Sequence, residues 1–277
     1  MQMPESFIRT VNDRLVRIKA MTGIKILFWS LRGSLDIGIY RNNSDADIIF
    51  VFTSSNPGYR AFHDIVGHGI DLWGWNIEDA LRTIQFCSEN DLQIIINNQC
   101  SISSEHRRGS LSYYFGLYVT IGNDFCVDSE HFLLSSFNNW IELYNPAIAT
   151  AEMQGRLAPI CRKIKSKEEL SGNECVYGLW YALMEKSLQE NKLPGANKIS
   201  TLIDQYGNDD LLNEFKVIHD IYREASGKKG QRFRSKVIND YLLSSFGETE
   251  AYLEKADLST KNIQSKIDPI MAICQGF

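Results

Sequence analysis

The stretch Asp45-Ala46-Asp47 runs directly into the apolar segment Ile48-Ile49-Phe50-Val51-Phe52, and a Gly33-Ser34 pair precedes it by ten residues. Side chains alternate across a β-strand, so a strand here turns Asp45 and Asp47 to one face and Ala46 to the interior. Two neighbouring carboxylates repel each other unless a cation lies between them. Mg²⁺ suits this position, because it prefers oxygen ligands and usually keeps waters and substrate phosphates in its shell. The stretch therefore predicts a metal–nucleotide site at the mouth of a buried strand.

The residues around this stretch form a longer pattern. The run Arg32-Gly33-Ser34-Leu35-Asp36-Ile37-Gly38, followed by Asn43-Ser44-Asp45-Ala46-Asp47, contains a Gly-Ser pair, a further Gly and a Ser-Asp-x-Asp motif. Together with the apolar strand it resembles the signature of the DNA polymerase β-like nucleotidyltransferase superfamily, in particular its small bacterial and phage branch of predicted nucleotidyltransferases. That family has a third carboxylate on a following strand, and Gly69-Ile70-Asp71-Leu72-Trp73 supplies a candidate.

The resemblance implies an α+β fold with two parts. A nucleotidyltransferase core, made of a short mixed β-sheet flanked by helices, is expected over residues 1–105. An α-helical C-terminal domain is expected over residues 106–277, and polar and charged residues cluster at the proposed boundary, in residues 101–110. The helical domain would close the cleft and contribute acceptor specificity.

The resemblance also implies a site and a reaction. Asp45, Asp47 and Asp71 would be catalytic and would bind two Mg²⁺ ions, with Mn²⁺ as an alternative metal. Asp71 would help to deprotonate an acceptor hydroxyl, which attacks the α-phosphorus of a nucleoside triphosphate such as ATP, and pyrophosphate leaves. The acceptor is left open among a protein side chain, an RNA end and a small molecule.

Three residues are expected to bind the nucleotide. They are Gly33, Ser34 and Ser44. A Gly-Ser turn presents backbone N–H groups and a hydroxyl, which suit phosphate oxygens. A tight turn without a ligand is the competing interpretation.

The resemblance continues, with departures, into the second half of the chain. Residues 174–194 resemble the helix and Pro-containing loop of the family's C-terminal part. Where basic residues are expected three before and three after the helix tyrosine, this chain has Glu174 and Trp180, and Gln93 replaces a frequent Glu. A second hypothesis therefore keeps the fold without turnover: the protein would act by binding nucleotide or a protein partner. Metal-dependent pyrophosphate release separates the two hypotheses.

A basic cluster offers a third hypothesis, a nucleic-acid adaptor. Lys228, Lys229, Arg232 and Arg234 surround Phe233, a combination that suits single-stranded nucleic acid. A solvated loop and helix start is the favoured interpretation, since charge runs are commonly solvated. Steep salt dependence of RNA binding would identify the adaptor.

Composition limits the remaining classes. The 44% apolar and 23% charged residues are ordinary for a globular chain, and the net charge of -5 argues against a surface built wholly for nucleic acid. No secretory signal or long apolar run is seen, so a cytoplasmic protein without membrane contact is expected. Six scattered cysteines lack the spacing of a zinc site and are expected to be reduced.

Local patterns predict the order of elements. Helical periodicity covers residues 4–20, and strands are expected at 24–30, 46–52 and 69–74. Residues 35–42 are expected to form a helical turn or loop, and 53–67 a turn-rich connection. Further helices are expected at 76–88, 90–98, 111–120, 128–144, 148–164, 172–191, 197–205, 209–224, 231–245 and 247–256.

Overall fold

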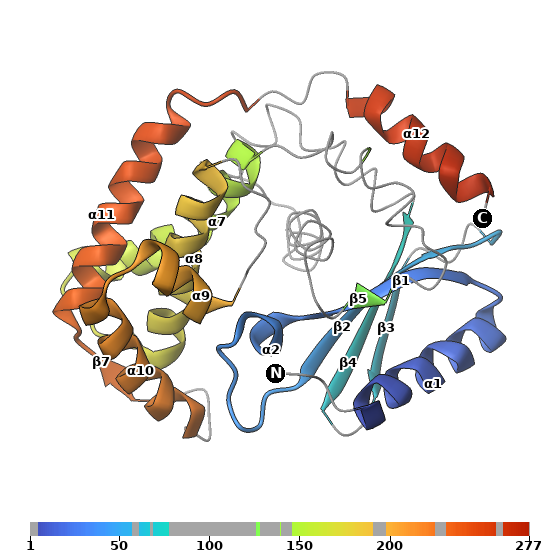
Figure 1. Ribbon diagram of the computed structural model, residues 1–277, viewed down its shortest axis with the longest axis horizontal. Helices are drawn as coiled ribbons and strands as arrows, with labels where there is room; N and C mark the ends of the chain where they lie inside the picture. The colour runs from blue at the N-terminus through green and yellow to red at the C-terminus, as the bar shows by residue number, and fades with distance from the viewer. Residues whose placement is uncertain are drawn as a thin grey trace.

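The computed structural model combines a β-sheet with a group of helices (Figure 1). It describes residues 5–56, 61–66, 69–77, 126–127, 139, 146–190, 198–224, 231–258 and 263–276. Helix α1 lies against the sheet, while α7, α8, α9, α10 and α11 gather beside it. The α+β class is confirmed.

Within the described residues, one sheet has the strand order β3-β4-β2-β1-β5. Its strands are β1 (Lys25–Arg32), β2 (Ala46–Thr53), β3 (Ala61–Val66), β4 (Ile70–Asn76) and β5 (Cys126–Val127). Strands β2 and β4 are parallel, whereas β1–β2, β1–β5 and β3–β4 are antiparallel, so the sheet is mixed. The sheet also includes β5, which lies beyond residue 105, the expected end of the core.

One face of the sheet packs against α1 (Glu5–Thr22). Strand β2 alternates as its sequence predicts, because every second side chain enters this core. The buried side chains include Val11, Leu15 and Ile18 of α1 and Ala46, Ile48, Phe50 and Phe52 of β2. Burying each of the Val, Leu, Ile and Phe side chains among them stabilises the fold by roughly 1.5–3 kcal/mol. Asp47 is consequently left on the opposite face.

The helices of the second half share a separate core. They are α7 (Pro146–Lys165), α8 (Gly172–Gln189), α9 (Ile199–Tyr206), α10 (Asp209–Glu224) and α11 (Lys236–Leu253). A short ribbon of β6 (Leu170–Ser171) and β7 (Arg232–Phe233) accompanies them. Ile37 and Ile39, which lie between β1 and β2 in the chain, are buried in this same core. The short helix α2 (Gly33–Ile37) therefore joins the sheet to the helical group.

Several expectations were wrong. Residues 61–66 form the edge strand β3 within the predicted turn-rich connection, because pairing with β4 satisfies their backbone groups. The helices predicted at 231–245 and 247–256 form one helix, α11, and α12 (Ile263–Gly276) was not predicted. Helix α11 continues through Gly247, where an added side chain would meet nothing within 4 Å. The helices predicted at 90–98 and 111–120 lie outside the described residues.

Candidate active site

The parallel pairing of β2 with β4 brings the predicted carboxylates together. Asp47 and Asp71 occupy directly paired positions on these strands, and neighbouring strands lie about 4.8 Å apart. Asp45 comes just before β2, where the backbone N–H of Ala46 donates to the Gly69 carbonyl at 2.6 Å. All three carboxylates thus lie at the end of the sheet where the parallel strands β2 and β4 begin.

The negative charges of Asp45 and Asp71 disfavour ionisation of Asp47. Burial, followed by the charges of Asp71 and Asp45, raises the pKa of Asp47 to about 6. Among the residues that the structure describes, no group of three His, Cys, Asp or Glu side chains is gathered closely enough to enclose a metal ion. Mg²⁺ does not require such a cage, because proteins usually hold it through one or two carboxylates together with substrate phosphates. The all-oxygen set at Asp47 and its neighbours fits that pattern.

Gly33 lies in contact with the Asp47 carboxylate. Its φ of 71° is one that residues with a side chain rarely adopt. A β-carbon built there would lie 2.1 Å from Asp47 Oδ2, which is less than any allowed contact. Only glycine permits this approach, which places the Gly33-Ser34 turn directly beside the Asp47 carboxylate.

Tyr177 of α8 reaches the same turn. Its hydroxyl shares a hydrogen bond with the Ser34 side chain, and the negative charge of Asp47 acts on it. Burial raises the pKa of Tyr177 well above its ordinary value, and Asp47 raises it further, so the phenol stays protonated at neutral pH. Tyr177 is the helix tyrosine between Glu174 and Trp180, and its contact with Ser34 was not predicted, since no local pattern links the two residues.

Ser44, the third predicted nucleotide-binding residue, closes a turn just before the carboxylates. Its hydroxyl accepts a hydrogen bond from the Arg41 N–H at 2.8 Å, and its own N–H donates to the Arg41 carbonyl at 3.1 Å. The turn fixes the path of the chain into Asp45. The hydroxyl hydrogen of Ser44 is not used by these two bonds.

Aromatic side chains follow Asp71 on its strand. Alternation turns Trp73 and Trp75 to the same face of β4 as Asp71. Trp73 is 40% exposed, which is unusual for so large an apolar side chain. This face of the sheet therefore offers a ring surface beside the carboxylates.

The two described departures from the family pattern have structural roles. Glu174 forms a capping box with Ser171 at the start of α8 and an ion pair with Lys163. Trp180 is buried in the helical core and packs edge-on against Tyr181. Gln93 lies outside the described residues.

The basic cluster is partly accounted for by local contacts. Arg232 donates to the Glu169 carbonyl at 3.1 Å, and Arg234 donates to the Lys167 carbonyl at 3.2 Å. Lys228 and Lys229 lie outside the described residues. Both arginines therefore anchor the β6–β7 ribbon, while remaining exposed.

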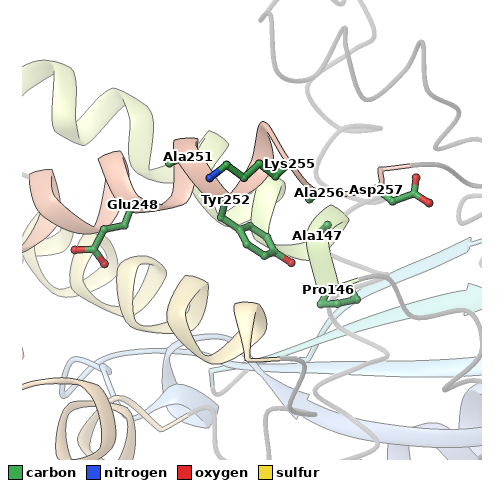
Figure 2. Close-up of a pocket in the computed structure, with 8 residues that line it drawn as sticks. All are labelled: Pro146, Ala147, Glu248, Ala251, Tyr252, Lys255, Ala256 and Asp257. Carbon is green, nitrogen blue, oxygen red and sulfur yellow. The ribbon is translucent and has the colours of Figure 1, made fainter.

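A pocket of about 550 Å³ lies elsewhere, between the start of α7 and the end of α11 (Figure 2). It is lined by Pro146, Ala147, Glu248, Ala251, Tyr252, Lys255, Ala256 and Asp257. The Tyr252 ring extends toward Pro146 and Ala147. None of the predicted site residues lines this pocket.

Comparisons with known proteins add no family. The chain matches no protein-family model and none of the curated proteins compared with it. Among the described residues, no helix combines the length and apolar character needed to cross a membrane.

Proposed function

We propose that this protein is a metal-dependent nucleotidyltransferase that moves a nucleoside monophosphate from a nucleoside triphosphate to an acceptor hydroxyl. The observation that carries the proposal is the contact of the Gly33-Ser34 turn with Asp47, which is itself paired in register with Asp71. A phosphate-binding turn and two carboxylates on neighbouring strands are the parts that metal-assisted phosphoryl transfer needs.

The roles of the residues follow from their positions. Asp45 and Asp47 would hold Mg²⁺, which when bound neutralises phosphate charge and polarises the reacting phosphorus. The backbone of the Gly33-Ser34 turn would hold the outer phosphates, because Tyr177 already engages the Ser34 hydroxyl. Asp71 would accept the proton of the acceptor hydroxyl as its oxygen bonds to the α-phosphorus. The bond from that phosphorus to pyrophosphate breaks in the same step. Trp73 offers a stacking surface for a base.

The test is a transfer assay with matched variants. The protein is incubated with each α-³²P-labelled nucleoside triphosphate, Mg²⁺ or Mn²⁺, and cell extract as the acceptor source. We expect labelled acceptor and pyrophosphate with the wild type, and loss of both with Asp47→Asn. Asp204→Asn, which changes an exposed carboxylate on α9, should leave transfer unchanged.

Asp47→Asn is informative because unfolding should not explain its effect. Removing the Asp47 charge relieves repulsion from Asp71 and Asp45, so the variant should be at least as stable as the wild type. Thermal unfolding checks this point. Transfer that survives in a folded Asp47→Asn protein would contradict the proposed role of this carboxylate.

The binding-only function remains the second candidate. It is favoured by Glu174 and Trp180, whose side chains serve helix capping and core packing where basic residues were expected. Nucleotide binding without label transfer or pyrophosphate release, under every metal and nucleotide tried, would select it.

A further inference from the structure

Two Tyr-Arg dipeptides, Tyr40-Arg41 before β2 and Tyr222-Arg223 in α10, contact each other. The arginine of each lies over the tyrosine ring of the other. The Arg41 guanidinium lies 4.6 Å from the centre of the Tyr222 ring, and the Arg223 guanidinium lies 5.7 Å from that of Tyr40. Between them, the Asn42 N–H donates to the Arg223 carbonyl at 3.1 Å. Figure 1 shows this segment as the blue loop that extends from α2 toward α10. These contacts hold two guanidinium groups at one junction.

His219 adds a third nitrogen-rich group on the same side of α10. Its ring stacks on Phe215, with centroids 5.1 Å apart, and also lies 6.4 Å from the Tyr222 ring that Arg41 covers. Burial and the neighbouring Arg223 charge lower the pKa of His219, while Asp220 opposes the shift. The junction thus gathers three basic side chains, with Asp220 as an acidic neighbour of His219.

Two buried nitrogen atoms at this junction lack a hydrogen-bond partner. Within the described part of the chain, His219 Nε2 and Arg223 Nε are buried and have no hydrogen-bond partner. Leaving such a group unsatisfied destabilises the fold, and more so when the group is charged. His219 and Arg223 are nevertheless partly exposed as residues, so a small ion has a route to them.

Tyr177 links this junction to the candidate active site. Tyr177 lies close enough to both Tyr222 and Asp47 for each to raise its pKa, and it bonds to Ser34. The Tyr222 ring that Arg41 covers is therefore a neighbour of the phosphate-binding turn.

We propose that Arg41, His219 and Arg223 form a binding site for a phosphate group, separate from the Gly33-Ser34 turn. An anion there would supply hydrogen-bond partners for these nitrogen atoms and balance the positive charge of the two guanidinium groups. Guanidinium groups suit this ligand, because their N–H fork matches phosphate oxygens. The phosphate belongs either to the nucleoside triphosphate or to a phosphorylated acceptor. This site requires no transfer chemistry, so it stands whether or not the proposed reaction occurs.

The experiment measures pyrophosphate binding by titration calorimetry in buffer with EDTA, which removes the metal-dependent site from the readout. We expect Arg223→Gln to weaken pyrophosphate binding by about tenfold or more, as loss of a charged hydrogen bond implies. Arg17→Gln, on the exposed face of α1, should bind like the wild type. Equal affinity in Arg223→Gln and wild type, or no pyrophosphate binding by the wild type, would overturn the proposal.

A second measurement needs no variant and covers the case in which Arg223→Gln fails to fold. The wild type is treated with phenylglyoxal, with and without pyrophosphate, and the modified arginines are identified by peptide mass spectrometry. Pyrophosphate should protect Arg41 and Arg223 but leave Arg17 reactive. Unchanged modification of all three would again contradict the site.

Competition then identifies the source of the phosphate. If the site takes the outer phosphates of the nucleotide, ATP should displace pyrophosphate and adenosine should not. If it takes a phosphate of the acceptor, pyrophosphate should still bind to protein saturated with a non-hydrolysable ATP analogue. Both results support a phosphate site, and they assign it to different substrates.

Discussion

Glu185 makes the stability of the helical group depend on pH. It lies fully buried in α8, where its Oε2 accepts hydrogen bonds from Thr249 at 2.9 Å and Ser245 at 3.3 Å. Its Oε1 has no partner among the described residues. Burial raises the pKa of Glu185 to about 8, although these two hydrogen bonds act in the opposite direction. The carboxyl is therefore protonated in the folded protein at neutral pH.

The sign of the effect follows from the unfolded chain, in which the pKa of Glu185 returns to its ordinary value of 4.5. Because the folded state binds the proton more tightly, its contribution to stability is complete below pH 4.5 and is lost as pH rises to about 8. Each pH unit in that window costs about 1.4 kcal/mol. From pH 6.5 to 8.5 the free energy of unfolding should fall by about 2 kcal/mol, since the loss ends near pH 8.

The assay is urea unfolding at pH 6.5, 7.5 and 8.5, for the wild type and for Glu185→Gln. Glutamine copies the shape of the protonated acid but does not titrate, so the variant should lack this slope. The difference between the two proteins isolates Glu185, because every other group cancels. Glu254→Gln, an exposed position after α11, should keep the wild-type slope.

Three other groups with shifted pKa values, Asp47, Cys161 and Cys175, affect stability mainly outside the range from pH 6.5 to 8.5. The pKa of Asp47 is raised from 3.8 to about 6, so its contribution to stability is lost as the pH rises from about 4 to about 6. Burial raises the pKa of Cys161 and Cys175 to about 12, and those thiols lose stability only above about pH 9. Parallel pH slopes for the wild type and Glu185→Gln would refute the conclusion that burial holds this carboxyl in its protonated form.

Three substitutions test local packing by urea unfolding. Gly33→Ala should destabilise the protein by at least about 1–2 kcal/mol for its positive φ alone, with further loss from the clash with Asp47; unchanged stability would mean that the turn can move away. Gly74→Ala should cost about 1–3 kcal/mol, because its β-carbon would lie 2.2 Å from the Phe50 ring, and a neutral result would contradict this packing of β4 on β2. Ser171→Ala should cost about 1 kcal/mol through loss of the α8 cap, whereas Ser171→Thr should retain most of it.

Features with a local cause were predictable from the sequence. The alternation of β2 and the position of Asp47 follow from the period of a strand, and the amphipathic α1 follows from helical spacing. The approach of Gly33 to Asp47 was anticipated because the Gly-Ser and Asp-x-Asp motifs belong to one pattern. These elements needed no knowledge of distant residues.

Features that depend on distant partners were missed. Strand β3 begins three residues after Gly58, and its own residues carry a weak pattern, so only its pairing with β4 identifies it. The helix α11 continues through Gly247 because packing on α8 and α7 outweighs the roughly 1 kcal/mol cost of a glycine. Tyr177 reaches Ser34, and Arg223 reaches Tyr40, from helices whose packing no local pattern reveals.

The burial of Ile37 and Ile39 in the helical core has a consequence for biosynthesis. Their cover comes from helices such as α8 and α10, which leave the ribosome long after the sheet strands β1 and β2. At about 5–20 residues per second, Arg223 follows Ile39 by roughly ten to forty seconds. Two large apolar side chains beside the Gly33-Ser34 turn therefore lack their complete cover until the end of this interval. A nascent chain halted before α8 should consequently be a good target for chaperones, and its Gly33-Ser34 turn would not yet have its final support.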